Sequence, residues 1–149
     1  MTASTPPTDP ILPVCDEDAR PFYEATRTGV LKIQRCVDTR RWIFPPRPVS
    51  PWGAHRAPEW AEIEGKGTLW SFVVPHPPLL PYFAERAPYN VILVALDADP
   101  TIRLTGNLLR EEGGSIGAFD AAQIEIGARV RVVFDRLDDE WTLPRWVLA

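Results

Sequence analysis

The sequence predicts a mainly β protein in which an N-terminal helix and a degenerate zinc-ribbon hairpin precede a five-stranded OB-fold barrel. The 149 residues include 17 prolines, which fit neither helix interiors nor central strands. Apolar and polar residues alternate in several segments after Gly67, as in half-buried strands. Five such segments with glycine bends and one long connection are typical of a small closed Greek-key barrel. A two-sheet sandwich is the alternative, but it would need more strands.

We divide the chain into a flexible arm (1–15), a helix with the degenerate hairpin (16–58) and the barrel (59–149). The arm is polar and rich in proline, with little to pack. It has neither the basic nor the apolar region of a signal peptide. No apolar run in the chain approaches the roughly 20 residues that span a bilayer. We therefore expect a cytoplasmic protein without membrane contact.

A short helix is predicted over residues 19–28. Carboxylates at 16–18 suit a helix N-terminus, because they face unsatisfied amides and the positive end of the dipole. Pro21 fits the first turn, and Gly29 is a good C-terminal stop.

The hairpin consists of predicted strands at 31–36 and 42–44, joined by a turn at 37–41. Its knuckles have the spacing of zinc-ribbon ligands but not their chemistry. Two thiolates three positions apart are needed at each knuckle, whereas this chain has Cys36 with Thr39, and Ser50 with Gly53. One thiolate, two hydroxyls and a glycine cannot hold structural zinc, so we predict neither metal nor cofactor. Alternatively, Cys36 is only a small buried hydrophobe.

The barrel strands are predicted from the period-2 pattern at 67–74, 89–97, 102–108 and 128–134, with an edge segment at 141–146. Pro144 cannot donate to a ladder, which favours the edge position. A long apolar loop is expected at 76–83. The predicted interior is Leu69, Phe72, Val91, Leu93, Ala95, Leu104, Val130 and Val132.

Charge is distributed unevenly along the chain. Residues 30–56 contain six basic side chains and one acidic, a local charge of +5 in a protein of net charge −4. An acidic protein is not a general nucleic-acid binder. The basic stretch is either a surface for an anion or acidic partner, or a solvated loop with scattered arginines.

Two interaction surfaces are predicted, because aromatic residues and arginine are enriched at the centres of protein interfaces. The first lies in the basic stretch and comprises Arg40, Arg41, Trp42, Arg47 and Trp52. The second lies in the apolar loop and comprises His76, Leu79, Leu80, Tyr82 and Phe83. The two histidines, His55 and His76, lie in proline-rich loops, and no Ser-His-Asp arrangement is visible, so no catalytic residue is predicted.

The order of these segments resembles the family called "domain of unknown function thirty-five", in which a rubredoxin-like zinc ribbon precedes an OB-fold. The matching pieces are Phe22-Tyr23-Glu24-Ala25, Leu31-x-x-Gln34-Arg35-Cys36, Phe44-Pro45-Pro46-Arg47-Pro48, Gly65-x-Gly67-Thr68-Leu69-Trp70-Ser71-Phe72, Ile126-Gly127-x-x-Val130 and Leu143-Pro144-Arg145.

This resemblance implies four ribbon cysteines, of which only Cys36 is kept, so Thr39, Ser50 and Gly53 are vestigial ligand positions. Family members accompany thiolase-fold enzymes that act on acyl-CoA. The resemblance therefore implies a non-catalytic accessory subunit of a thiolase-like or lipid-transfer-protein-like enzyme. That enzyme would be an aldolase of steroid or lipid side-chain degradation, or an acyltransferase. The accessory subunit would support its partner and help to form the CoA channel, where arginines suit the CoA phosphate. The alternative is a single-stranded nucleic-acid binder that uses the OB-fold face.

Overall fold

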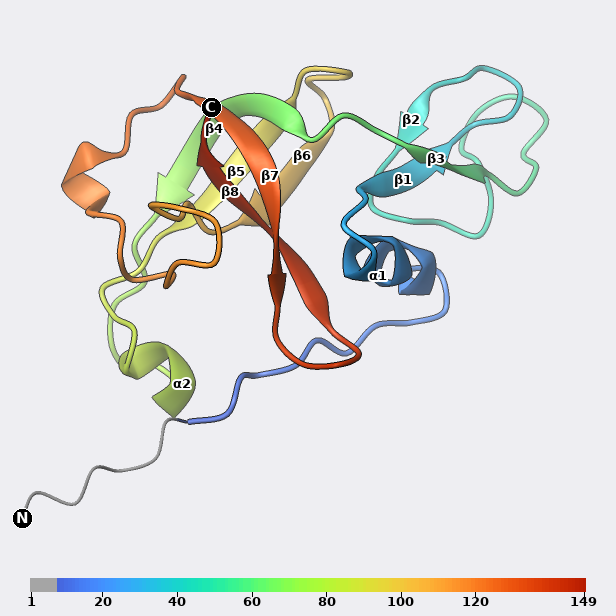
Figure 1. Cartoon of the computed structure of the whole chain (residues 1–149). Helices are drawn as coiled ribbons and strands as arrows, with labels where there is room; N and C mark the ends of the chain where they lie inside the picture. Colours follow the sequence, from blue (N-terminus) through green and yellow to red (C-terminus); the bar gives the residue numbers. More distant parts are fainter. Residues whose placement is uncertain (1–7) are drawn as a thin grey trace, which may run out of the picture.

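The computed structural model describes residues 8–149, which form a mainly β protein with two sheets and little helix (Figure 1). The elements in chain order are α1 (Arg20–Arg27), β1 (Lys32–Arg35), β2 (Trp42–Ile43), β3 (Glu59–Glu62), β4 (Lys66–Val73), α2 (Pro81–Ala84), β5 (Val91–Leu96), β6 (Arg103–Gly106), a 3-10 turn (Ala121–Gln123), β7 (Arg129–Arg136) and β8 (Thr142–Leu148). The predicted fold class is confirmed. Residues 1–7 of the predicted arm lie outside the described residues.

The first sheet forms the ribbon and has the order β2-β1-β3. β1 and β2 pair as the predicted hairpin, and β3 is an additional strand that pairs with β1 along all four of its residues. Helix α1 packs beside this sheet (Figure 1) and begins after Asp16, whose Oδ1 accepts a hydrogen bond from Ala19 N at 2.8 Å. Gly29 has φ +76° and ends the helix as expected. The division of the chain into three parts stays a prediction.

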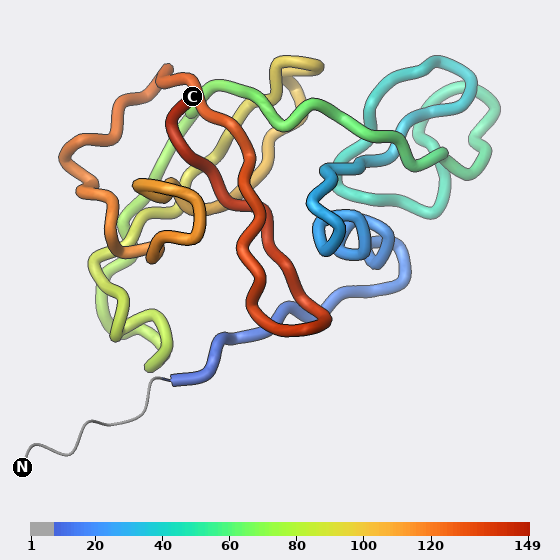
Figure 2. Tube along the Cα trace, viewed as in Figure 1, coloured from blue at the N-terminus to red at the C-terminus, as the bar shows by residue number. Residues whose placement is uncertain are grey.

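The second sheet forms the barrel and has the order β6-β5-β4-β7-β8. Figure 2 shows how the chain leaves the ribbon loops and passes through the segment that connects β3 to β4 into this curled sheet. β8 is more than the predicted edge segment, since it pairs with β7 over seven residues. On its other side Trp146 forms a parallel bridge with Leu108, which closes the barrel. Pro144 is accommodated opposite Phe134 in the ladder.

The predicted interior is correct in part. Leu69, Leu104 and Val130 are buried, but the face predicted for β5 is wrong. Ile92, Val94 and Leu96 are buried there, whereas the predicted residues Val91, Leu93 and Ala95 are only half-buried. All six residues of β5 are apolar, so the sequence has no alternation from which to choose the inner face. Phe72 and Val132 are also half-buried and pack against the core.

The segment 76–83 is not wholly a loop, because Pro81–Ala84 forms the short helix α2. Pro81 stands in its first turn, where a missing N–H is tolerated. The helix carries Tyr82 and Phe83, and the Phe83 ring stacks on Tyr89 at a centroid distance of 5.3 Å. Phe83, at the end of the apolar segment, thus packs against the barrel.

We expect Gly67→Ala to destabilise the protein. Gly67 is buried in β4, and a Cβ there would lie 2.3 Å from the backbone oxygen of Ala95 on the neighbouring strand. Overpacking of this kind costs about 1–3 kcal/mol of unfolding free energy. Urea unfolding measures the loss, with Ser71→Ala on the same strand as the control. Unchanged stability of Gly67→Ala would contradict the close approach of β4 and β5.

Candidate functional site: the ribbon knuckles and the arginine–tryptophan surface

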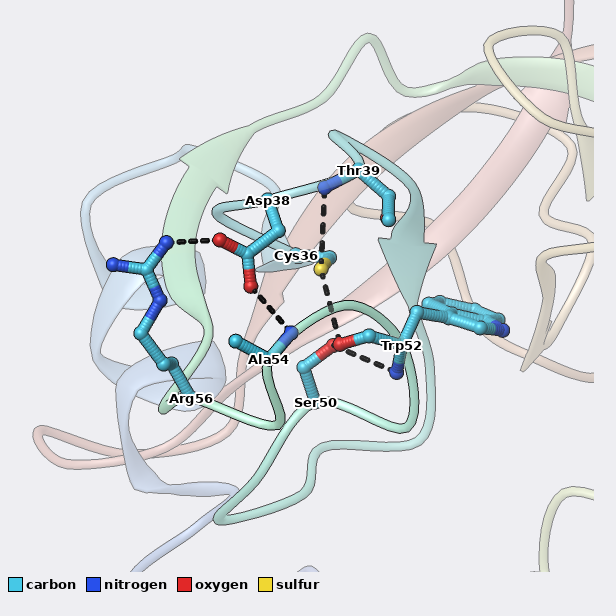
Figure 3. Close-up of polar contacts among 7 residues, drawn as sticks. All are labelled: Cys36, Asp38, Thr39, Ser50, Trp52, Ala54 and Arg56. Carbon is cyan, nitrogen blue, oxygen red and sulfur yellow. Dashed lines mark hydrogen bonds and ion pairs between the residues drawn. The ribbon is translucent and has the colours of Figure 1, made fainter.

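The first knuckle places a buried thiol between the two ribbon loops (Figure 3). Cys36 follows β1, and its backbone is fixed by a tight turn in which Arg40 N donates to Cys36 O at 2.9 Å and Cys36 N donates to Arg41 O at 2.8 Å. Thr39 N donates to Cys36 Sγ at 3.5 Å, and Sγ lies 3.7 Å from Trp52 O on the opposite loop. Hydrogen bonds with Ser50 and Thr39 lower the pKa of the Cys36 thiol to about 7.

The second knuckle is closed by its own side chain and backbone. Ser50 is buried, and its Oγ accepts from Trp52 N at 3.1 Å and donates to Trp52 O at 3.0 Å. Gly53 has φ +65°, and a Cβ at this position would lie 2.6 Å from both the Cβ and Oδ2 atoms of Asp38. The glycine therefore leaves the space that the Asp38 carboxylate occupies.

Asp38 connects the two loops (Figure 3). Its Oδ2 accepts from Ala54 N at 2.9 Å, and its Oδ1 forms an ion pair with Arg56. The hydrogen bonds from Arg56 and Ala54 hold the pKa of the Asp38 carboxyl below its ordinary value. A carboxylate thus links the loops at the place where a ribbon would hold its ion.

The four ligand positions do not fit zinc. Only Cys36 offers a thiolate, Thr39 offers a neutral hydroxyl, the Ser50 hydroxyl is engaged with backbone, and Gly53 has no donor atom. Within residues 8–149 there is no group of three or more His, Cys, Asp or Glu side chains that could hold a metal ion. The loops are cross-linked by Asp38 instead.

Four of the predicted surface residues, Arg41, Trp42, Arg47 and Trp52, line one cavity of about 300 Å³. The Arg41 guanidinium stacks over the Trp52 ring at 3.9 Å from its centroid. The far wall belongs to the barrel and comprises Asp99, Thr101 and Ile102. Arg40 does not join this group, because it forms an exposed ion pair with Glu59.

The second predicted surface is divided by the structure. Tyr82 and Phe83 line a different cavity, beside the barrel, and Leu79 packs against buried residues. Leu80 and His76 are exposed. The two predicted surfaces therefore remain separate, and their roles stay predictions.

Sequence reasoning missed Asp38 as the link between the loops. Two signals for it were available: Asp38 is the single acid in a basic stretch, and Gly53 stands at a ligand position. Neither signal names Arg56 as the partner, because the ion pair joins residues on different loops.

We expect Asp38→Asn to lower the Tm at about pH 6, because the amide cannot form the ion pair with Arg56. An ionised carboxylate with a lowered folded-state pKa stabilises the fold above the ordinary Asp value of about 4. This stabilisation is lost as the pH falls through the folded pKa. The Tm difference between the unmodified protein and the Asp38→Asn variant should thus persist to about pH 5 and shrink below about pH 4. Asp139→Asn is the control, since that acid pairs with Arg136 while 93% of its side chain is exposed. A pH-independent difference would contradict the carboxylate link.

We expect chelation to leave the fold unchanged. EDTA should not alter the Tm, and elemental analysis should find no stoichiometric zinc, because the donor set cannot bind it. One tightly bound equivalent of zinc per chain would overturn the carboxylate link.

Comparisons with known proteins place the chain in a family. The model of the ChsH2 C-terminal OB-fold domain matches residues 60–135, and the model of the ChsH2 rubredoxin-like zinc ribbon domain matches residues 24–49. The structure resembles a chain of the solved "Ltp2-ChsH2(DUF35) aldolase", with a TM-score of 0.78 and 31% identity over 91% of this chain and 98% of that one.

Two curated relatives are longer proteins. One is the "probable enoyl-CoA hydratase alpha subunit" of Thermomonospora curvata, 32% identical over 89% of this chain and 38% of its own length. The other is the "3-oxo-4,17-pregnadiene-20-carboxyl-CoA hydratase alpha subunit" of Mycobacterium tuberculosis, 31% identical over 90% of this chain and 39% of its own length. The chain thus spans about two fifths of the curated relatives it matches. No helix within residues 8–149 is long and apolar enough to cross a membrane. From the two matching domain models and the structural similarity, we conclude that the chain belongs to the ChsH2 family of DUF35-type proteins.

Proposed function

We propose that this chain is a non-catalytic accessory subunit of a thiolase-like aldolase that acts on acyl-CoA substrates in steroid or lipid side-chain degradation. The observation that carries this proposal is the similarity to the "Ltp2-ChsH2(DUF35) aldolase" over 98% of the matched chain. A match over nearly a whole chain of an aldolase assembly supports the same kind of assembly here. The acyltransferase partner that the sequence also allowed has no such support.

The arginine–tryptophan surface, formed by Arg41, Trp42, Arg47 and Trp52, is the proposed contact with the partner. Arg41 and Arg47 form no salt bridge within residues 8–149, and the Arg41–Trp52 stack presents an exposed cation on an aromatic ring. Such pairs are typical of the centres of protein interfaces. The same free guanidinium groups would suit the phosphates of CoA if the surface borders the substrate channel.

The polar groups of this chain support a non-catalytic role. The Nδ1 atom of His55 lies 3.1 Å from Ser50 O, within the knuckle, and His76 is exposed on its loop. The Cys36 thiol has a lowered pKa but is fully buried, so a substrate cannot reach it. The reaction is therefore assigned to the partner.

A hydratase assembly is the second candidate, because both curated relatives are hydratase alpha subunits. Since this chain spans only about two fifths of their length, their activity need not reside in the matched part. Nucleic-acid binding is disfavoured by the net charge of −4 and because three barrel arginines are paired with acids: Arg129 with Asp97, Arg136 with Asp139, and Arg145 with Asp135.

Co-expression with a thiolase-like aldolase subunit should give a stable hetero-oligomer in size-exclusion chromatography. We expect Trp52→Ala and Arg41→Ala each to weaken its affinity by at least about tenfold, as at interface hot spots. Arg131→Ala is the matched control, since Arg131 is exposed on β7, outside this surface.

Three outcomes would contradict the proposal. One is a chain that elutes alone and binds an oligonucleotide with a steep salt dependence. Another is assembly with an enoyl-CoA hydratase subunit only, which favours the second candidate. If the complex forms but neither variant weakens it, the partner binds elsewhere.

A further inference from the structure

A cavity of about 450 Å³ lies where the arm, α1 and the β7–β8 hairpin meet the barrel. Its volume is in the range of small-molecule sites, about 300–1,000 Å³. Most of its walls are apolar or aromatic and include Phe22, Phe44, Phe83, Val91, Leu104 and Leu143. This is the cavity that Tyr82 and Phe83 line, and the partner surface proposed above does not require it.

One end of the cavity is polar. Arg145 lines it although only 9% of the residue is exposed. Its Nε donates to Asp135 Oδ2 at 3.2 Å, and its Nη1 donates to Asn107 Oδ1. The Nη2 atom, with two hydrogens, has no hydrogen-bond partner within residues 8–149. Trp146 Nε1, and not Arg145 Nη2, is the buried side-chain nitrogen without a partner among the described residues, so Nη2 keeps accessible surface. A charged guanidinium that lines a cavity with free N–H groups can donate them to a ligand oxygen in place of water.

The charge at this end favours an anion over a neutral group. The side chain of Arg145 is 11% exposed and that of Asp135 is 30% exposed. Water therefore screens the carboxylate better than the guanidinium, and of the two charges only that of Arg145 lines the cavity. Thr105 and Asn107 add further polar lining beside it.

The N-terminal arm covers the apolar part. Ile11 and Pro13 contribute to the wall, and Thr8 forms hydrogen bonds to the Glu85 carboxylate at the end of α2. In Figure 1 the arm runs from beside α2 past the end of the β7–β8 hairpin to α1. The arm thereby forms part of the apolar wall of the cavity.

We propose that this cavity is a binding site for an amphiphilic carboxylate, whose apolar body lies among the aromatic side chains and whose carboxylate accepts hydrogen bonds from Arg145 Nη2. The site gives a role to Arg145 in the Leu143-Pro144-Arg145 motif. All of the lining residues belong to this chain, so binding can be measured without a partner enzyme.

Isothermal titration of the full chain with decanoate tests the proposal. We expect binding with a Kd below about 1 mM, as for a ligand of this size. Decylamine has the same chain length and the opposite charge, and it should not bind. Amide shifts in ¹⁵N-edited spectra should be centred on Leu104, Thr105 and Leu143.

Three variants locate the ligand. Arg145→Gln should weaken decanoate binding by at least about tenfold, because a charge-assisted hydrogen bond is lost. Thr105→Phe should abolish binding by filling the cavity from an exposed position that tolerates a larger side chain. Arg131→Gln, an exposed arginine outside the cavity, is the control and should bind normally. If Arg145→Gln does not fold, the loss or retention of decanoate binding by Thr105→Phe decides whether the ligand occupies this cavity.

The proposal is overturned if decanoate gives no heat at about 1 mM, a concentration at which a fitted apolar acid of this size should bind. It is also overturned if decylamine binds equally well, because the carboxylate would then have no role. Normal binding by Thr105→Phe would place the ligand elsewhere and overturn it as well.

Discussion

The fold depends on the hydrogen bonds that close the barrel between the end of β6 and β8. Trp146 N donates to Asn107 O at 3.0 Å, and Leu109 N donates to Trp146 O at 2.7 Å. The fully buried Asn90 joins the same seam, since its side chain donates to Leu108 O at 2.9 Å and accepts from Leu108 N at 2.6 Å. Buried backbone groups are costly when unpaired, so this seam stabilises the closed sheet over one with two free edges.

The ribbon also needs contacts that hold its segments together, and it has fewer residues to supply them. A two-residue β2 and a proline-rich loop bury little apolar surface, so the knuckles need a cross-link that packing cannot supply. A metal ion provides it in a zinc ribbon. Here Asp38 reaches across to Ala54 and Arg56, and Gly53 leaves room for its carboxylate. The cysteine-poor ribbon is thus held together by an ion pair and hydrogen bonds that water and acid can reach.

Most helices and strands could be predicted from the sequence. Predictions failed for features that depend on contacts between residues distant in the chain. Acidic residues, Pro21 and Gly29 were sufficient for α1, and alternation was sufficient for the hairpin and for strands β4 to β7. β8 was predicted only as an edge segment. The inner face of β5 could not be chosen because all its residues are apolar. β3 was missed because Glu59–Glu62 has a weak pattern and owes its strand conformation to pairing with β1. The spacing of Cys36 and Ser50 predicted the knuckles, whereas the Asp38 link and the Arg145 cavity combine segments far apart in the chain.

The basic stretch is less available to anions than its sequence charge suggests. Arg56 and Arg40 are paired with acids, and Glu59 lies outside the segment from which the charge was counted. Of the arginines in the proposed partner surface, Arg41 and Arg47 are left without an acid, and Arg41 stacks over the Trp52 ring. A stacked guanidinium keeps its charge but presents a planar apolar face, which suits a protein surface better than a diffuse phosphate field. This geometry supports the proposal that a protein partner occupies the surface, with any CoA phosphate at its border.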